Sequence, residues 1–173
     1  VKASGSPGSA RQMNGVDAFI TSVVTARSSG TSFSETELND MAADAWKAVR
    51  ADKVFDMVLC TIKIKQAIAG FNGNSTRYID ASERRLVREI LVYESAVGPH
   101  RIMQHRDVRD NAGSTTVYGL KEDMHKVAYL DKPMFDELAK LGDADRGQWV
   151  TEFTLENYEE KADLKRTGYA QNG

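Results

Sequence analysis

The histidines between positions 100 and 125 are the first residues whose types could bind a metal ion. With one nearby aspartate, they give the candidate ligands His100, His105, Asp107 and His125. A zinc or transition-metal site needs several such ligands to converge on one point. On a strand, His100 and His105 lie an odd number of positions apart, so their side chains point to opposite faces. We therefore expect solvated or edge-strand histidines, and we predict no metal and no cofactor.

A second possible ion site begins at Asp143 and Asp145, which are spaced as in a calcium-binding loop. That motif requires an oxygen ligand at its fifth position, glycine at its sixth and glutamate at its twelfth. Here Gly147 occupies the fifth position and Thr154 the twelfth. We interpret the segment as a plain turn.

Nucleophilic catalysis would have to use Cys60 or one of the serines. No serine stands in a strand-to-helix elbow motif, and no Cys-His pair has a recognisable context. The glycines of Gly70-Phe-Asn-Gly73 follow a predicted helix instead of preceding one, and no Lys-Ser/Thr pair comes after them. They are therefore not a phosphate-binding loop. We predict no catalytic residue and no enzyme activity.

The densest basic cluster lies on two segments that we expect to pair as strands. Its members are Arg84, Arg85, Arg88, Arg101 and Arg106. Acidic residues are interleaved with them, namely Glu83, Glu89, Glu94 and Asp107. This mixture favours a salt-bridged surface between subunits over a nucleic-acid groove. The formal net charge of −2 likewise gives no broad electrostatic footprint for nucleic acid.

Length and composition indicate an ordinary globular protein. The 173 residues suffice for one domain or for two small subdomains that share a sheet, and 41% of them are hydrophobic and 28% charged. Cys60 is the only cysteine, which excludes a disulfide framework and fits a reducing compartment. No stretch approaches the roughly 20 apolar residues that span a bilayer.

Apolar spacing and capping residues predict the elements of the first two thirds. Ser34 and Glu37 form a capping box ahead of a helix at 35–49. The apolar stripe of that helix contains Leu38, Met41, Ala42, Ala45, Trp46 and Val49. Residues 16–24 fit either a short helix or a strand, and 28–32 are typical of a polar loop. The other predicted elements are a helix at 62–71 capped by Thr61, and strands at 54–59, 86–93, 100–108 and 117–130.

We expect the rest of the chain to be organised around the stretch from 138 to 158. Met134, Phe135, Leu138 and Leu141 have helical spacing, so we predict a helix that ends at Gly142 in the left-handed conformation, followed by a turn at 143–147. From Gln148 to Tyr158 the sequence then alternates, with Trp149, Thr151, Phe153 and Leu155 on one face. These eleven residues at roughly 3.3 Å each would reach about 36 Å, a long strand. We expect Trp46 and Trp149 in the core.

This stretch also carries a family resemblance. Residues 137–148, Glu-Leu-Ala-Lys-Leu-Gly-Asp-Ala-Asp-Arg-Gly-Gln, followed by Glu-Phe-Thr-Leu-Glu at 152–156, are similar to the carboxy-terminal signature of major head proteins of tailed double-stranded-DNA bacteriophages. Leu141 departs from the threonine expected in that signature. The resemblance continues upstream in the same order, through 10–20, 38–46, 57–59 with 68–71, and 87–106.

The resemblance implies an α+β protein with the Hong Kong 97 type of capsid fold. In that fold an axial domain of helices around a sheet joins a peripheral domain of long strands. The chain would then comprise a flexible lead-in at 1–12, an axial-type domain at 13–111 and a return segment at 112–173. It would be a carboxy-terminal portion, with the amino-terminal arm, extended loop and spine helix missing, as a chain that begins with Val1 suggests.

The function implied by the resemblance is structural. Copies would form the hexamers and pentamers of an icosahedral shell in the virion, assembled in the bacterial cytoplasm around double-stranded DNA bound without sequence specificity. Scaffold, portal and decoration proteins are further implied partners, and a membrane is not. By itself, the chain is expected to be a monomer or a small, weak oligomer. Two alternatives stay open: an encapsulin-like shell protein, and a small α/β binding module or hydrolase with its site in the loops at 28–33 and 109–115.

Overall fold

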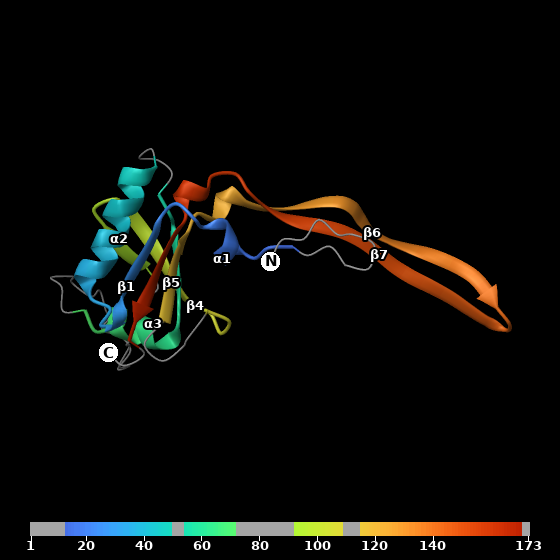
Figure 1. Cartoon of the computed structure of the whole chain (residues 1–173), viewed down its shortest axis with the longest axis horizontal. Coiled ribbons are helices and arrows are strands. Elements are labelled where there is room, and N and C mark those ends of the chain that lie inside the picture. The colour runs from blue at the N-terminus through green and yellow to red at the C-terminus, as the bar shows by residue number, and fades with distance from the viewer. Residues whose placement is uncertain (1–12, 50–53, 72–91, 109–114, 171–173) are drawn as a thin grey trace, which may run out of the picture. The chain divides into compact units, whose positions relative to one another are not determined.

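The computed structural model describes residues 13–49, 54–71, 92–108 and 115–170 (Figure 1). The chain divides into two compact units. The first contains Val1–Phe19 and Asp123–Tyr158, and the second contains Ile20–Glu122 and Glu159–Gly173. The described part is a mixed α+β protein in which strands predominate.

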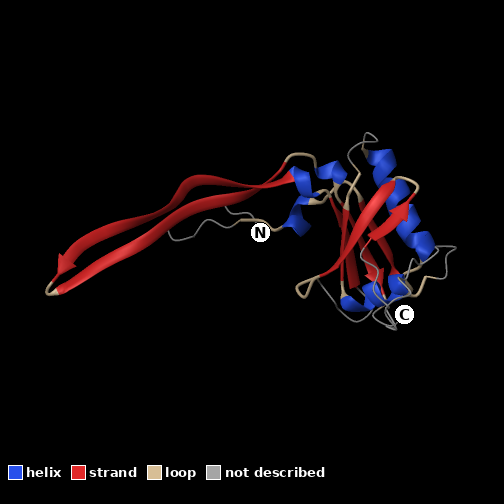
Figure 2. Ribbon diagram, turned by 180° about the vertical axis from the view of Figure 1, so that it is seen from behind, coloured by secondary structure: helices blue, strands red, loops and turns tan. Residues whose placement is uncertain are grey.

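The second unit is built on a six-stranded mixed sheet (Figure 2). Its strand order is β1-β8-β5-β2-β4-β3, with parallel pairing of β1 with β8 and of β2 with β4. The strands are β1 (Val24–Thr31), β2 (Met57–Cys60), β3 (Val92–Ser95), β4 (Gly98–Gln104), β5 (Thr115–Leu120) and β8 (Leu164–Tyr169). The sheet therefore joins strands from both ends of the chain.

Two helices, α2 (Glu35–Ala48) and α3 (Ile62–Ala69), share one hydrophobic core with this sheet. Both helices begin as predicted, because the hydroxyls of Ser34 and Thr61 accept the backbone N–H groups of Glu37 and Ile64. Their buried residues meet side chains from the centre of the sheet. That core includes Leu38, Met41, Ala45, Ile64, Ile68, Val58, Ile102 and Leu164.

Several predicted elements are confirmed where the structure describes them. The predicted strand at 54–59 is present from residue 57 on as β2, and the predicted strands at 86–93 and 100–108 overlap with β3 at 92–93 and with β4 at 100–104. The ambiguous segment 16–24 contains the short helix α1 (Val16–Phe19), and only its last residue, Val24, belongs to β1. The predicted loop at 28–32 is wrong, because β1 continues to Thr31 beside β8. Residues 86–91 lie outside the described residues.

The first unit contains the two longest strands, β6 (His125–Leu141) and β7 (Ala144–Asn157), paired antiparallel in a two-stranded sheet. The predicted helix at 134–141 is wrong. Met134, Phe135 and Leu138 lie in a regular stretch of β6, in which Phe135 is on the opposite face from the other two, and a register shift follows between Leu138 and Leu141. Apolar residues on both faces therefore mimic helical spacing. Gly142 has the predicted left-handed conformation, with a φ of +74°, but it turns β6 into β7. The turn consists of residues 142 and 143, so residues 144–147 of the predicted turn belong to β7 instead.

Short 3-10 helices, η1 (Glu122–Met124) and η2 (Glu160–Ala162), complete the described elements. The side chain of Glu160 anchors η2 to the segment before β1, because it accepts hydrogen bonds from the backbone N–H and hydroxyl of Thr21, both at 2.7 Å. The backbone N–H of Ser22 donates to the same carboxylate oxygen. Within the described residues, no helix is both long and apolar enough to cross a membrane.

Candidate assembly surface

The ribbon formed by β6 and β7 carries most of the exposed large apolar side chains of the described residues. All three register shifts add residues to β6, so β7 alternates without interruption along its 14 residues. Directly opposed residues share a face of the ribbon. The predicted alternation of Trp149, Thr151, Phe153 and Leu155 on one face is therefore confirmed.

One face of the ribbon is aromatic and apolar. We define this aromatic face by Val127, Tyr129, Phe135, Trp149, Phe153 and Leu155. Tyr129 lies beside Phe153 with ring centroids 6.0 Å apart, and Phe135 beside Trp149 at 5.5 Å. These four side chains are nevertheless 51–75% exposed. Neighbouring rings thus pack against one another, while their outer surfaces face solvent.

The opposite face of the ribbon is mainly polar and charged. Its residues include Lys126, Asp131, Asp136, Arg146, Gln148, Glu152, Thr154 and Glu156, with Met134, Leu138 and Val150 as large apolar exceptions. A two-stranded sheet is marginally stable in water unless a further element covers an apolar face. Exposed apolar patches of this kind mark interaction surfaces. The amphipathic ribbon is therefore the strongest candidate for contact with another molecule.

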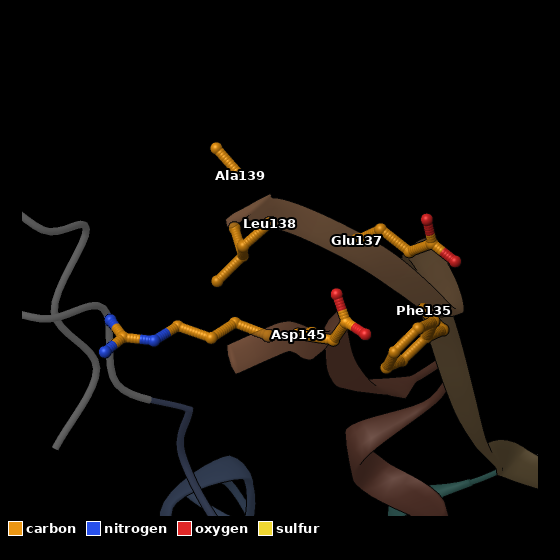
Figure 3. A pocket seen from close by; sticks show the side chains of 7 residues that line it. Phe135, Glu137, Leu138, Ala139 and Asp145 are labelled. Carbon is orange, nitrogen blue, oxygen red and sulfur yellow. The ribbon is translucent and has the colours of Figure 1, made fainter. Parts of the chain in front are cut away.

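A shallow pocket lies near the turn end of the ribbon (Figure 3). Next to it, the ring of Phe135 occupies the space above the backbone of Gly147, which has no side chain. The lining is both apolar and charged, and consists of Phe135, Glu137, Leu138, Ala139, Asp145, Arg146 and Gly147. Such a lining suits a protein side chain with an apolar stem and a polar end better than a small cofactor.

A buried ion-pair cluster holds α2 on the sheet of the second unit. One carboxylate oxygen of Glu37 accepts hydrogen bonds from Arg27, Arg166 and Tyr169, each at 2.9 Å. Arg166 is 2% exposed and also donates to Asp44 at 2.6 Å. Burial opposes the charged form of Glu37, but the Tyr169 hydrogen bond and the two arginines hold its pKa below the usual value. The charged members of this cluster form their hydrogen bonds with one another, so we interpret the cluster as structural.

The predicted metal ligands do not converge. His100 is buried, which contradicts the expectation of a solvated or edge histidine, because β4 lies between β2 and β3. Its Nδ1 is 2.9 Å from the Phe55 carbonyl oxygen and its Nε2 2.7 Å from Ser95 Oγ. Burial lowers the pKa of His100, so the ring is neutral. His105 is exposed beside Asp107, whereas His125 begins β6 in the other unit.

No group of three or more potential ligands occurs among the described residues. The absence of a bound metal or cofactor stays a prediction. Cys60 is buried, and burial raises the pKa of its thiol to about 12, so it is a packing residue and a poor nucleophile. The Ser95–His100 contact was not predicted from sequence. It closes the β3–β4 turn, where Ser95 Oγ also accepts the Val97 N–H.

The basic cluster is described only in part. Arg101 forms an ion pair with Glu122, Arg106 is exposed, and Arg84, Arg85 and Arg88 lie outside the described residues. Of the two loops proposed for a binding module or hydrolase, 28–33 lies largely in β1 and most of 109–115 lies outside the described residues.

The predicted core positions of both tryptophans are wrong. Trp149 is 75% exposed on the aromatic face, and Trp46 is 53% exposed on α2. Trp46 borders the stripe that α2 buries, which is formed by Leu38, Met41, Ala42 and Ala45. The two large indoles therefore face solvent in the described structure, in different units.

The second unit is held together by ion pairs among its own residues, and the first unit exposes an amphipathic ribbon. These are features of a structural protein that contacts other molecules. Comparison with known families gives the same class, a phage major capsid protein. The model of the SU10 major capsid protein family matches residues 1–170. The chain belongs to the SU10 major capsid protein family. No curated protein matches it.

Membership of this family gives the chain a structural role in a virus capsid, in contact with other copies of itself. It also agrees with the expectation that the chain is not an enzyme. The resemblance to tailed-phage head proteins stated from the sequence is thereby confirmed at the level of a phage major capsid protein.

Proposed function

We propose that the protein is the structural subunit of an icosahedral phage head with the Hong Kong 97 type of capsid fold. Many copies associate as hexamers and pentamers, and the closed shell encloses double-stranded DNA without sequence-specific contacts. Family membership supports the capsid role, and the exposed aromatic face of the ribbon is the observation that carries self-association.

Within this proposal, the two units belong to different domains of the capsid fold. We assign the six-stranded sheet with α2 and α3 to the axial-type domain, and the ribbon of β6 and β7 to the peripheral-type domain. The division of the sequence at 111/112 stays a prediction, and we propose that the axial-type domain also includes β5 and β8, which pair within the same sheet.

Association depends physically on many modest contacts repeated around the shell. The aromatic face supplies apolar area to such contacts, and the charged face of the ribbon supplies orientation, because mismatched charges are costly at an interface. Scaffold, portal and decoration proteins would meet the outside and inside of the same shell. Assembly takes place in the bacterial cytoplasm, and the finished protein resides in the virion.

Sedimentation velocity and negative-stain microscopy of the purified chain test this proposal. We expect association that increases with protein concentration and yields small assemblies of several copies. A monomer at every concentration would show that the aromatic face does not carry self-association, and would overturn that part of the proposal. A turnover screen with hydrolase substrates is the matched test of the alternative class, for which the described residues offer no ligand cluster.

A further inference from the structure

The two outer edges of the ribbon differ. The outer edge of β6 is interrupted by three register shifts and contains Pro133, features that hinder the addition of another strand. β7 runs for 14 residues without a register shift of its own and without proline. Among the described strands, β7 pairs only with β6. An edge of this length and regularity is a template for strand addition.

Hydrogen bonding at the base of the ribbon shows which backbone groups of β7 point outward. The N–H of Tyr158 donates inward, to the carbonyl oxygen of Met124. The N–H of Leu155 donates in the other direction, to Met13 Sδ at 3.1 Å. The backbone N–H and C=O groups of successive residues in a strand point alternately to its two sides. The outward groups of the central part therefore belong to Gly147, Trp149, Thr151 and Phe153.

We infer that β7 pairs with β7 of a second copy, antiparallel and about a two-fold axis at Thr151. This inference rests on the proposed function, for which it names one contact between copies. Thr151 then lies opposite Thr151 of the second copy, and Trp149 opposite Phe153 of the second copy. Both are residues with outward backbone groups, so each pair can exchange two hydrogen bonds. The two ribbons form one four-stranded sheet.

Side-chain chemistry selects this register. On the charged face, Arg146 lies opposite Glu156 of the second copy, and the symmetry forms this ion pair twice. On the aromatic face, the pairs of Trp149 with Phe153 join the two aromatic faces into one row, and such aromatic cross-strand pairs are stabilising. No like charges lie opposite one another in the central part.

Two-fold registers whose axis passes through the next residue with outward backbone groups on either side of Thr151 fit less well. An axis at Phe153 places Val150 opposite Glu156 and Trp149 opposite Asn157, and it forms no ion pair. An axis at Trp149 pairs Arg146 with Glu152 but places the aromatic Phe153 opposite the charged Asp145. The axis at Thr151 alone among these satisfies both faces of the ribbon.

Pairing about Thr151 has one cost in the existing contacts. The N–H of Leu155 must exchange Met13 Sδ for the carbonyl oxygen of Gly147 in the second copy. A thioether is a weak acceptor and a backbone carbonyl a strong one, so this exchange is favourable. The same surface patch serves both copies, as an isologous two-fold contact requires.

Oxidative cross-linking tests the position of the axis. Thr151→Cys places two thiols opposite one another, with Cα atoms about 5.5 Å apart, a separation that a disulfide can span. Gln148→Cys is the matched control, since its two copies would lie about 20 Å apart at roughly 3.4 Å per residue. Cys60 is buried and contributes no background. We expect Thr151→Cys to form a covalent dimer and Gln148→Cys to form none. Equal cross-linking of both variants would overturn the inference.

Charge exchange tests the register independently. Arg146→Glu and Glu156→Arg each place like charges opposite one another, so each variant alone should lose the contact. An equimolar mixture pairs a doubly acidic with a doubly basic edge and should restore it. If neither variant loses the contact, or the mixture fails to restore it, the pairing is wrong. If the chain forms assemblies while Thr151→Cys does not cross-link, the inference fails and the proposed function stands. A monomer in all samples contradicts the inference and also the proposed self-association through the ribbon.

Discussion

The ring of Phe135 lies over the backbone of Gly147, on the opposite strand of the ribbon. A Cβ atom added to Gly147 would stand 2.1 Å from Cζ of Phe135, well inside contact distance. The same ring lies beside Trp149, with centroids 5.5 Å apart. Position 147 therefore accepts only glycine if the aromatic face is to keep its order.

Gly147→Ala is expected to displace the Phe135 ring and to break its contact with Trp149. The ring is 52% exposed and can rotate outward, so the cost should lie at the lower end of the 1–3 kcal/mol typical of overpacking, about 1 kcal/mol. Faster hydrogen exchange in β6 and β7, with unchanged exchange in the six-stranded sheet, would confirm it. Gln148→Ala is the control on the polar face, and equal exchange in both variants would contradict the prediction.

Glu37→Gln is expected to destabilise the second unit strongly. The substitution leaves the guanidinium of Arg166 buried with a weaker partner, and breaking a buried ion pair typically costs about 3–5 kcal/mol. Asp44 still accepts from Arg166, so we expect a loss near 3 kcal/mol. Urea unfolding measures it, with the exposed Asp40→Asn on the same helix as control. Equal stability of the two variants would show that the cluster is dispensable.

Stability should fall in acid, in part because of Glu160. Hydrogen bonds from Thr21, opposed by burial and supported by Ser22, lower the pKa of Glu160 from 4.5 to about 2. A carboxyl group with a lowered folded-state pKa stabilises the fold above its unfolded-state pKa, and this contribution disappears as pH falls from 4.5 towards 2.

Glu160→Gln should therefore flatten the dependence of unfolding free energy on pH within that window, while the unsubstituted chain loses stability there. Glu159→Gln, at the adjacent position, is the control. Parallel pH profiles for the unsubstituted chain and Glu160→Gln would argue against a role for this carboxylate in acid stability.

Local signals in the sequence were sufficient to predict the two helices α2 and α3. Ser34 and Thr61 cap helices whose apolar residues are spaced for one buried face, and both helices are present. β7 was predictable for the same reason, since its alternation is uninterrupted. β6 was not, because its apolar residues lie on both faces of the ribbon and register shifts interrupt its period of two, and only the pairing with β7 reveals those shifts.

Long-range relationships explain the other differences. β1 and β8 pair across almost the whole length of the chain, so residues 28–31 show no strand signal of their own. His100 is buried because β3 covers its strand on one side, which strand position alone does not indicate. From the sequence, Trp149 looks like a core residue, because a strand with an exposed apolar face and a strand with a buried apolar face show the same alternation of apolar and polar residues. The contact of Phe135 with Gly147 has no local signal at all.

The central claim, that the aromatic face of the ribbon is the surface through which copies associate, is tested most directly by sedimentation velocity of Trp149→Ser beside Trp46→Ser. Both indoles are exposed, at 75% and 53%, so neither substitution should unfold its unit. We predict loss of association for Trp149→Ser and association like that of the unsubstituted chain for Trp46→Ser. Unchanged association of Trp149→Ser would contradict the claim.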